Sequence, residues 1–542
     1  MESKDAIFDA MKYIQGKDRS QSILFPSHLD QIVDADNEVR MIDLFVEAID
    51  IKDYSFYIKD STEGRPQYNP KDLLKLFIYG YLNSIRSSRV LEKECKRNIE
   101  LMWLMKELVP DHNTIANFRR DNTKAIRKVF RATVAMAKNF ELIGGKLLAG
   151  DSTKLRAQNS KKNNFNEAKI DRHLEYIENK LNEYNQALEQ ADGDIAKTSE
   201  IESQIKTQEA RKEKYNALQA QLSETGESQI STSDPDSRQI MTRNNISEVA
   251  YSVQTTVDSQ HGITIDYKTT NQNDAKALYP MTRRAKTILQ SSDFTGLYDK
   301  GYHTSSEIKK ALDLGVNIMV AIPEVASNAP DKAYNVSNFI YNYDQDTFTC
   351  PQGQTLTTNG KWYTRTRSKS SSTRVKHYKT SACLTCPAFA LCTENKKGRC
   401  LERSEYAEYV EQNKNNIENN KEIYKRRQAI VEHTYGILKR QWGFYYIMSK
   451  KGIQRADADV GFMFTALNLR RIFNLIDPKL LRDYLRSLGL YFSSFSYSNK
   501  PIFFHSTSSN FSSQNFKSNI TQNLNSINAM YLSSKTLYLS KC

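Results

Sequence analysis

The feature of the sequence that most constrains the fold is an alternation of strand-like and helix-like segments between residues 146 and 323. Short apolar runs that predict strands end in turn residues, and segments with helical spacing lie between them. The expected order is strand, two-stranded hairpin, helix, strand, helix, strand. The segments are Lys146–Ala149, Val249–Asp258, Gly262–Asn271, Ala275–Leu289, Phe294–Tyr302, Ser305–Gly315 and Val316–Pro323. This mixed order predicts an α/β domain with helices packed on a sheet.

Helical patterns flank and interrupt this domain. Residues 1–140 are expected to be helical, with a clear start at Asn69-Pro70, a capping residue followed by proline. Residues 166–226 are rich in Glu, Lys, Gln and Leu, and Ala191–Asp194 divides them into two stretches. They predict an antiparallel helical hairpin inserted after the first strand. Residues 406–476 are again expected to be helical.

The net charge indicates what kind of partner the chain binds. Lys and Arg number 77 against 63 Asp and Glu, a balance of +14. That excess favours a polyanionic partner, either nucleic acid or an anionic membrane surface. Apolar runs stay well short of the roughly 18 residues that a membrane span needs. The opening MESKDAIFDAMKYIQG is unlike a secretory signal, so we expect the chain in the cytoplasm.

A basic segment follows a second helix start at Asp111. Its basic residues lie on a predicted helix, so they form either a solvated face or a surface that contacts the DNA backbone, and the sequence leaves both interpretations open. The residues are Arg119, Arg120, Lys124, Arg127, Lys128 and Arg131.

Five of the seven cysteines cluster between residues 350 and 400. In a cytosolic chain such a cluster favours metal ligands over disulfides. A C-x2-C half-site is common in tetrahedral zinc centres, which makes a structural zinc site the favoured interpretation. Reduced, metal-free thiols and an iron–sulfur cluster stay open as alternatives. The favoured ligands are Cys350, Cys383, Cys386 and Cys392.

Three acids stand where a catalytic metal site could form. Asp151 is expected just beyond a short apolar strand, Asp299 at the end of a second one, and Glu432 on a helix. Acids at adjacent strand ends converge, and a helix across the sheet can add a third. Such a trio can hold two divalent ions that clamp the attacking and leaving oxygens of phosphoryl transfer. Mg²⁺ suits carboxylate ligands, and Mn²⁺ can substitute for it.

Several segments together give the chain a resemblance to the DDE transposases of bacterial insertion sequences. The resemblance covers about residues 20–476. The segments that carry it are GRPQYNPKDLLKLFIYGYLNSIRSSRVLEKECKRNIELMWL with PDHNTIANFRR, GDSTKLRAQNSKKNN, DPDSR with YSVQTTVD, TNQNDAKAL, YDKGYHTSSEI and YKRRQAIVEHTYGILKRQWGF. In this order and spacing the set is highly specific.

The resemblance implies a ribonuclease-H-like catalytic domain in which Asp151, Asp299 and Glu432 bind the metal ions. It implies an enzyme that cuts at the ends of its own element and joins those ends to target DNA. Double-stranded DNA is then the partner, and the task of holding two ends together implies a homo-oligomer. The alternative is a catalytically inactive, transposase-derived DNA-binding protein. A zinc-dependent scaffold in which the acids are incidental is a further rival.

Basic residues near the acids are candidates for phosphate contacts. Many relatives carry Y-x2-R-x3-E-x6-K, whereas Tyr424, Arg427, Glu432 and Lys439 give one more residue before the Glu. On a straight helix that extra residue turns the Arg by about 100° relative to the Glu, so either a site role or an ordinary surface role is open for Arg427. The expected DNA-binding residues are Lys439, Arg440, Arg119, Arg120, Lys300 and Lys154.

These observations divide the chain into five parts. The expected parts are a helical DNA-binding domain at 1–140, a first catalytic part at 141–323, a Cys-rich insertion at 324–405, catalytic C-terminal helices at 406–476, and a Ser-, Asn- and aromatic-rich tail at 487–542. The tail has no acidic residues and a poor pattern, and we expect it to be disordered.

Overall fold

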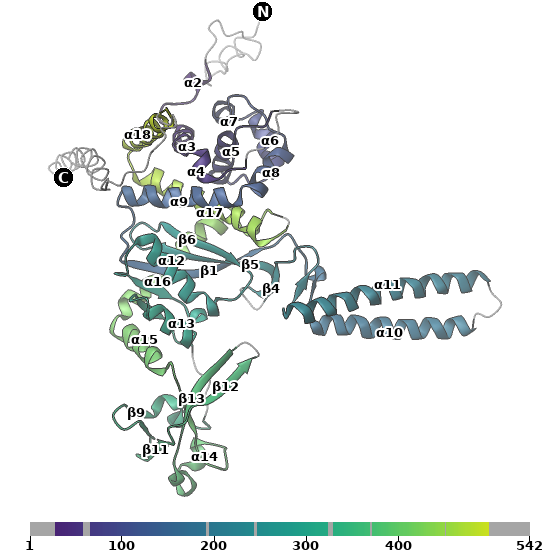
Figure 1. Cartoon of the computed structure of the whole chain (residues 1–542), viewed down its shortest axis with the longest axis vertical. Helices are drawn as coiled ribbons and strands as arrows, with labels where there is room; N and C mark the ends of the chain where they lie inside the picture. The colour runs from purple at the N-terminus through teal and green to yellow at the C-terminus, as the bar shows by residue number, and fades with distance from the viewer. Residues whose placement is uncertain are drawn as a thin grey trace, which may run out of the picture. The chain divides into compact units, whose positions relative to one another are not determined.

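The computed structural model describes residues 28–57, 66–190, 195–242, 246–323, 329–368, 371–449 and 451–497 (Figure 1). The contacts discussed below lie within the compact unit that ends at Gly489. In the described residues, no helix is long and apolar enough to cross a bilayer.

The N-terminal part is helical, as predicted. Its helices are α2 Leu29–Ile32, α3 Glu38–Glu47, α4 Ile51–Tyr54, α5 Pro70–Leu82, α6 Ser88–Cys95, α7 Ile99–Leu104, α8 His112–Asp121 and α9 Thr123–Asn139. α5 begins where the sequence indicates, because the Asn69 side chain accepts a hydrogen bond from the Lys71 amide and Pro70 occupies the first turn. Every residue of α5 from Asp72 to Leu82 is buried, which makes this helix the centre of the bundle.

A mixed sheet forms the centre of the catalytic part. Its strands are β1 Leu147–Arg156, β4 Arg238–Met241, β5 Ser247–Asp258, β6 Thr264–Thr270, β7 Thr295–Tyr298 and β8 Asn317–Val320. The order is β4-β5-β1-β7-β8, and β6 also pairs with β5. β5 is antiparallel to β1 and β6, whereas β1, β7 and β8 are parallel. This is the strand arrangement of the ribonuclease-H fold, and it confirms the predicted fold class.

One strand is longer than the sequence predicts. β1 runs from Leu147 to Arg156, so Asp151 lies inside the strand and not beyond it. The polar residues after Asp151 end the apolar run but not the strand, because pairing with β5 continues as far as Arg156 opposite Ala250. Leu155 is buried on this extension. The expectation that the strand ends at Ala149 is therefore wrong.

Helices cover the sheet and join it to the N-terminal bundle. They are α12 Leu278–Leu289, α13 Ser305–Leu312, α15 Ala407–Asn419, α16 Lys421–Gly436 and α17 Ile453–Leu475. α17 contacts β6 on one side and α5 and α9 on the other (Figure 1). Phe77 of α5 stacks on Phe462 of α17 with ring centroids 4.9 Å apart. The N-terminal helices and the sheet thus share one hydrophobic core.

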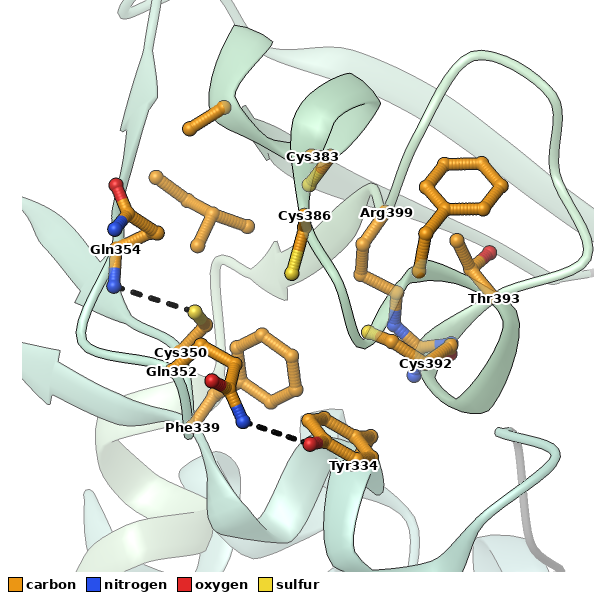
Figure 2. A pocket seen from close by; sticks show the side chains of 13 residues that line it. Tyr334, Phe339, Cys350, Gln352, Gln354, Cys383, Cys386, Cys392, Thr393 and Arg399 are labelled. Carbon is orange, nitrogen blue, oxygen red and sulfur yellow. Dashed lines mark hydrogen bonds between the residues drawn. The ribbon is translucent and has the colours of Figure 1, made fainter.

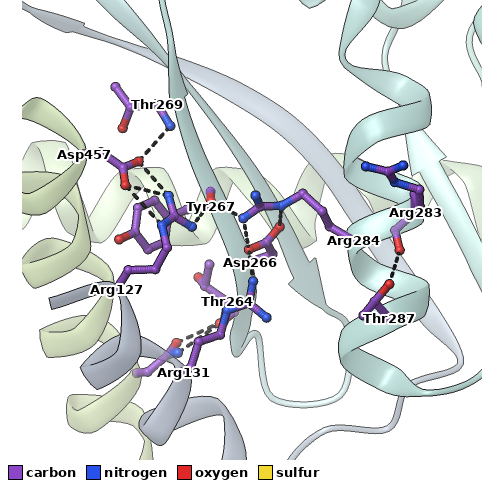
Figure 3. A network of polar contacts seen from close by, with 11 residues as sticks. Arg127, Arg131, Thr264, Asp266, Tyr267, Thr269, Arg283, Arg284, Thr287 and Asp457 are labelled. Carbon is purple, nitrogen blue, oxygen red and sulfur yellow. Dashed lines mark hydrogen bonds and ion pairs between the residues drawn. The ribbon is translucent and has the colours of Figure 1, made fainter. Parts of the chain in front are cut away.

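Ion pairs reinforce this junction (Figure 3). Arg127 of α9 makes a bidentate pair with Asp457 of α17, with a closest N–O distance of 2.6 Å. Asp266 of β6, which is fully buried, pairs with Arg131 and Arg284. Two members of the predicted basic face therefore hold the bundle to the sheet. The Arg131 side chain is still 39% exposed, whereas that of Arg127 is 27% exposed.

The predicted helical hairpin is present as α10 Glu167–Gln190 and α11 Ile195–Thr225. Lys212 pairs with Glu178, and Gln219 donates a hydrogen bond to Asp171, so the two helices run antiparallel. Its own small core contains Phe165, Ile170, Ile177, Tyr215, Leu218, Leu222 and Ile230. The two-residue strands β2 Asn164–Phe165 and β3 Ile230–Ser231 pair at its base. The predicted separator, Ala191–Asp194, lies outside the described residues.

The Cys-rich segment folds around a second sheet, which the sequence did not indicate. Its strands are β9 Ile340–Asn342, β10 Thr347–Thr349, β11 Thr355–Thr358, β12 Tyr363–Ser368, β13 Ser371–Lys379 and β14 Leu401–Ser404. The basic Ser/Thr-rich stretch forms the β12–β13 hairpin. A short helix, α14 Phe389–Cys392, follows.

The start of the expected disordered tail is helical. α18 spans Pro478–Tyr497, so the expected tail begins within this helix. Leu481 and Leu485 of this helix are buried in the main core. The rest of the tail, 498–542, lies outside the described residues.

Candidate active site

Two of the three predicted acids lie at the same level of neighbouring strands. Leu147, Leu148 and Ala149 of β1 pair with Thr295, Gly296 and Leu297 of β7, a constant offset of 148 residues. Continued beyond the last paired residues, the same offset brings Asp151 level with Asp299, the residue that follows β7. Residues in register on parallel strands point to the same face of a sheet, about 4.8 Å apart. Asp299 directly follows β7, as predicted, and its side chain caps the Gly301 amide at 2.9 Å.

A third aspartate that sequence reasoning missed borders the same space. Asp274 begins a short 3-10 turn, Asp274–Lys276, after β6. A Cβ built on Gly301 lies 3.1 Å from Asp299 Oδ1 and 3.5 Å from Asp274 Oδ2, so the two carboxylates face the same point. Gln254 Nε2 donates to Asp274 Oδ1 at 2.6 Å, and Lys154 Nζ donates to it at 3.2 Å. The segment TNQNDAKAL was a signal for this residue, because its Asp follows a predicted strand.

The electrostatics of the three aspartates show their proximity. The pKa of Asp151 is raised to about 6, mainly by burial and in smaller part by like-charge repulsion from Asp299 and Asp274. The Ser152 amide and the Arg427 guanidinium act in the opposite direction and lower this pKa. A site that gathers carboxylates against their mutual repulsion is one that a cation stabilises.

Helix α16 lies against this part of the sheet. The Tyr424 hydroxyl donates to the Tyr298 carbonyl at 2.9 Å, and Arg427 Nη1 donates to Asp151 Oδ2 at 3.3 Å. Val431 is buried against Ala149 and Val257. Of the two interpretations left open for Arg427, the structure therefore favours a position in the site.

The extra residue before Glu432 changes which side of α16 it occupies. Successive helix residues are about 100° apart, so with Val431 facing the sheet, Glu432 lies on the flank of the helix. Its side chain is exposed and accepts a hydrogen bond from Gln428 Nε2 at 2.9 Å. Across the described residues, no three His, Cys, Asp or Glu side chains already lie at metal-coordination spacing. The structure thus brings Asp151, Asp299 and Asp274 together and leaves Glu432 beside them.

The predicted phosphate-binding residues fall into two groups. Lys154 lies in the site, between Asp274 and Ser252 Oγ. Lys439 Nζ donates to the Lys154 carbonyl at 3.0 Å. Lys439 and Arg440 lie on the π-helical segment Ile437–Gln441 that continues α16. Arg440 and Lys300 are exposed, and Lys300 follows Asp299 directly.

Arg119 and Arg120 differ although they are neighbours on α8. Arg119 is only 7% exposed and donates to the Tyr81 hydroxyl at 3.0 Å, with the buried carboxylate of Asp459 3.6 Å away. The prediction that Arg119 contacts DNA is contradicted by this burial, since its charge is neutralised inside the core. Arg120 is exposed and pairs with Asp121 at 2.6 Å.

The clustered cysteines separate into a set of four and a single residue. Cys350, Cys383, Cys386 and Cys392 line one pocket, together with Phe339 and Arg399 (Figure 2). Cys400 does not line it, and its thiol lies 3.9 Å from the Leu401 carbonyl. These are the four cysteines that the sequence favoured.

Comparisons with known proteins agree with the resemblance seen in the sequence. Residues 27–121 match the family model described as "Transposase domain (DUF772)", and residues 349–473 match the model described as "Transposase DDE domain". No curated protein matches the chain. A solved structure of a piggyBac transposase synaptic complex with hairpin DNA is similar, at 11% identity, a TM-score of 0.31, and coverage of 91% of this chain and 90% of that one. A TM-score this low does not support an argument, so the similarity to transposases depends on the two family models. The chain is therefore similar to a transposase domain over residues 27–121 and to a transposase DDE domain over residues 349–473.

Proposed function

We propose that this chain cleaves phosphodiester bonds at the ends of its own element and transfers the freed 3′ ends to target DNA, using Asp151, Asp299 and Glu432. The observation that carries the proposal is that Asp151 lies on β1 and Asp299 directly follows the parallel neighbour β7, where its charge acts on Asp151. Asp151 and Asp299 are held by a core that spans the sheet and the N-terminal bundle, so their backbones are rigidly placed. Reactions of this type depend mainly on positioning and charge neutralisation.

The donor set fits divalent magnesium. Carboxylate oxygens are the ligands that Mg²⁺ prefers, with Mn²⁺ as a substitute, and the charges of Asp299 and Asp274 both act on Asp151. Two bound ions supply an activated water and neutralise charge on the attacking and leaving oxygens. Asp151 and Asp299 would hold them from the sheet. Glu432, with its flexible side chain on the flank of α16, would join by rotating toward the strands.

The remaining residues of the site have supporting roles in this proposal. Asp274 accepts hydrogen bonds from Lys154 and Gln254 and keeps these two side chains in place beside the site. Arg427 positions the Asp151 carboxylate. The exposed cations Lys300, Arg440 and Arg120, with Lys439, are proposed to grip DNA phosphates, where they would contribute affinity but no sequence reading. We further propose that two or more chains act together in the bacterial cytoplasm, because two element ends must be held at once.

A non-catalytic DNA-binding remnant is the second candidate function. The observation that favours it is the exposed position of Glu432, which leaves the third predicted ligand outside the aspartate cluster. The two candidates differ in whether DNA is cut, because both predict binding.

Cleavage of a DNA fragment that carries the coding region and its flanks tests the proposal. The full-length protein should produce cuts at defined positions in Mg²⁺, and chelator or Asp151→Asn should abolish them. Asp293→Asn is the matched control, since Asp293 is an exposed acid near the same sheet that pairs only with the surface Lys146. Binding without cleavage by the folded wild type would support the remnant. Cleavage that survives Asp151→Asn would show that the proposed metal site is wrong.

A further inference from the structure

The Cys-rich insertion has a small hydrophobic core for a six-stranded sheet. Its buried apolar side chains are Phe339, Phe348, Leu356, Tyr378 and Leu401. Two cysteines, Cys350 and Cys392, pack against this core. Small folding units with few buried apolar residues usually need a staple, either disulfides or a structural metal. The cysteines of this segment are free thiols, so a metal is the staple that the chemistry allows.

Four cysteines from three separate chain elements meet at one cavity of about 30 Å³ (Figure 2). Cys350 lies in the turn after β10, Cys383 and Cys386 lie in and just after a 3-10 turn, and Cys392 ends α14. A cavity this small admits about one atom the size of water and is far below the several hundred Å³ that an organic ligand needs. The cavity is lined by apolar side chains and by Tyr334, Gln352, Gln354, Thr393 and Arg399, and among these lining groups the thiols are the ligands that zinc prefers.

Cys350 lies in a tight turn whose backbone amide groups hold its sulfur in place. The Gln354 amide donates to Cys350 Sγ at 3.3 Å, and the Cys350 amide donates to the Gln354 carbonyl at 2.9 Å. Gly353 completes this turn with a φ of +75°, a conformation that other residues rarely adopt. An amide aimed at sulfur stabilises the thiolate, which is the form of cysteine that binds metal.

A second glycine lets the chain pass close to another of the four cysteines. Gly398 has a φ of +87°, and a Cβ added there would lie 2.8 Å from the Cβ of Cys383. The loop before β14 therefore packs directly on Cys383. Arg399, the next residue, donates to the Cys392 carbonyl at 3.3 Å.

The fifth cysteine of the segment, Cys400, does not join the other four at the cavity. It belongs to the same segment and is similarly half-buried, yet it does not line the cavity. Arg399 acts on both thiols, but Cys392 also interacts with Cys383, Cys350 and Cys386, whereas Cys400 interacts with Lys379 and Glu402. The fold thus selects four cysteines out of five.

We propose that Cys350, Cys383, Cys386 and Cys392 bind one zinc ion as a structural tetrathiolate site. Four sulfur ligands fill the tetrahedral shell that zinc prefers and leave no open position for catalysis. The side chains are not yet at coordination spacing, so binding draws the sulfurs inward by rotation about their Cα–Cβ bonds. The site is separate from the aspartates and does not depend on the proposed strand-transfer chemistry.

Metal analysis of the purified full-length protein tests this proposal. We expect about one zinc per chain. Cys350→Ser and Cys386→Ser should each lose it, whereas the matched control Cys400→Ser should retain it. Protein without zinc, or with zinc that survives both ligand substitutions, would overturn the proposal. If the purified protein contains iron and absorbs visible light, the cysteines bind an iron–sulfur cluster, and the zinc proposal is overturned.

A measurement on the unmodified chain guards against misfolding of the variants. Cysteine alkylation followed by mass spectrometry should find the four ligands protected before treatment with a strong chelator and reactive after it. Cys95, which is buried in the main core outside this segment, should react to the same extent in both states. Equal reactivity of the four ligands with and without chelator would contradict zinc binding even if every serine variant misfolds.

Discussion

The aspartate cluster and the cysteine pocket are supported in opposite ways. Asp151 and Asp299 are positioned by strands of a large sheet whose core extends into the N-terminal helices. The cysteines lie on turns around a sheet with few buried apolar side chains. In the first case the scaffold positions ligands that repel one another. In the second case the ligands themselves are expected to hold the scaffold.

This difference follows from the chemistry of the two ligand types. Burial, together with the charges of Asp299 and Asp274, raises the pKa of Asp151, so keeping Asp151 ionised costs free energy that the rest of the fold must supply. Thiols lose a proton only when the metal binds, and the free energy of binding then becomes free energy of folding. A catalytic site can therefore be preformed without its metal, whereas a structural site need not be.

The largest effect is expected at the aspartates in register. Asp299→Asn should lower the rate of DNA cleavage by about a thousand-fold or more, because a metal ligand supplies several kcal/mol of transition-state stabilisation. The fold should persist, since Asp299 lies at a strand end. Rates measured beside Asp293→Asn, with circular dichroism as a folding check, test this. A rate within a few-fold of wild type would remove Asp299 from the metal site.

Removal of the proposed zinc should have a large but local effect. Cys386→Ser should abolish protection from hydrogen exchange in β10, β11 and β13 while β5 and β6 stay protected, because only the small sheet depends on the metal. If protection is lost equally in both sheets, or in neither, the claim that zinc stabilises only the small sheet is contradicted. Cys400→Ser is again the control, and its exchange pattern should match that of wild type.

Substitutions of Asp274 and Glu432 test which of the two acids is the third metal ligand. Asp274→Asn should reduce cleavage about 10- to 100-fold, the usual cost of disturbing a residue that supports a metal ligand. The proposal that Glu432 binds the metal requires a larger loss in Glu432→Gln. Parallel rate measurements with Mg²⁺ and Mn²⁺ separate the two. A greater loss in Asp274→Asn than in Glu432→Gln would make Asp274 the third ligand.

The sequence predicted features that depend on local pattern and missed those that depend on contacts between residues far apart in the chain. The strands and helices of the sheet followed from local pattern, and Asp299 was found because a turn directly follows its strand. Asp274 was missed because only tertiary packing brings its turn back beside β7. Arg119 has the sequence context of a surface residue, and its burial depends on Asp459, far along the chain. The second sheet was missed because strands such as β12 lack apolar runs.

The smallest effect concerns the free energy of unfolding and not catalysis. The pKa of Asp151 in the fold is raised from 3.8 to about 6, so the folded protein binds a proton more tightly than the unfolded chain. Without metal, stability therefore falls as pH rises from about 4 to 6, and the full penalty persists above that range. Asp151→Asn removes the penalty and should raise the free energy of unfolding by about 2 kcal/mol at pH 7.5, with part offset by the lost Arg427 contact.

Thermal unfolding in chelator at pH 5 and pH 7.5 measures this effect. The variant should be more stable than wild type at pH 7.5, and the difference should shrink at pH 5, where Asp151 is mostly protonated. Saturating Mg²⁺ should stabilise wild type but not the variant, because binding to the folded state adds stability only where the ligands are ionised. If Asp151→Asn is destabilising at both pH values, Asp151 is a structural partner of Arg427, and the carboxylates are not held in repulsion for a cation.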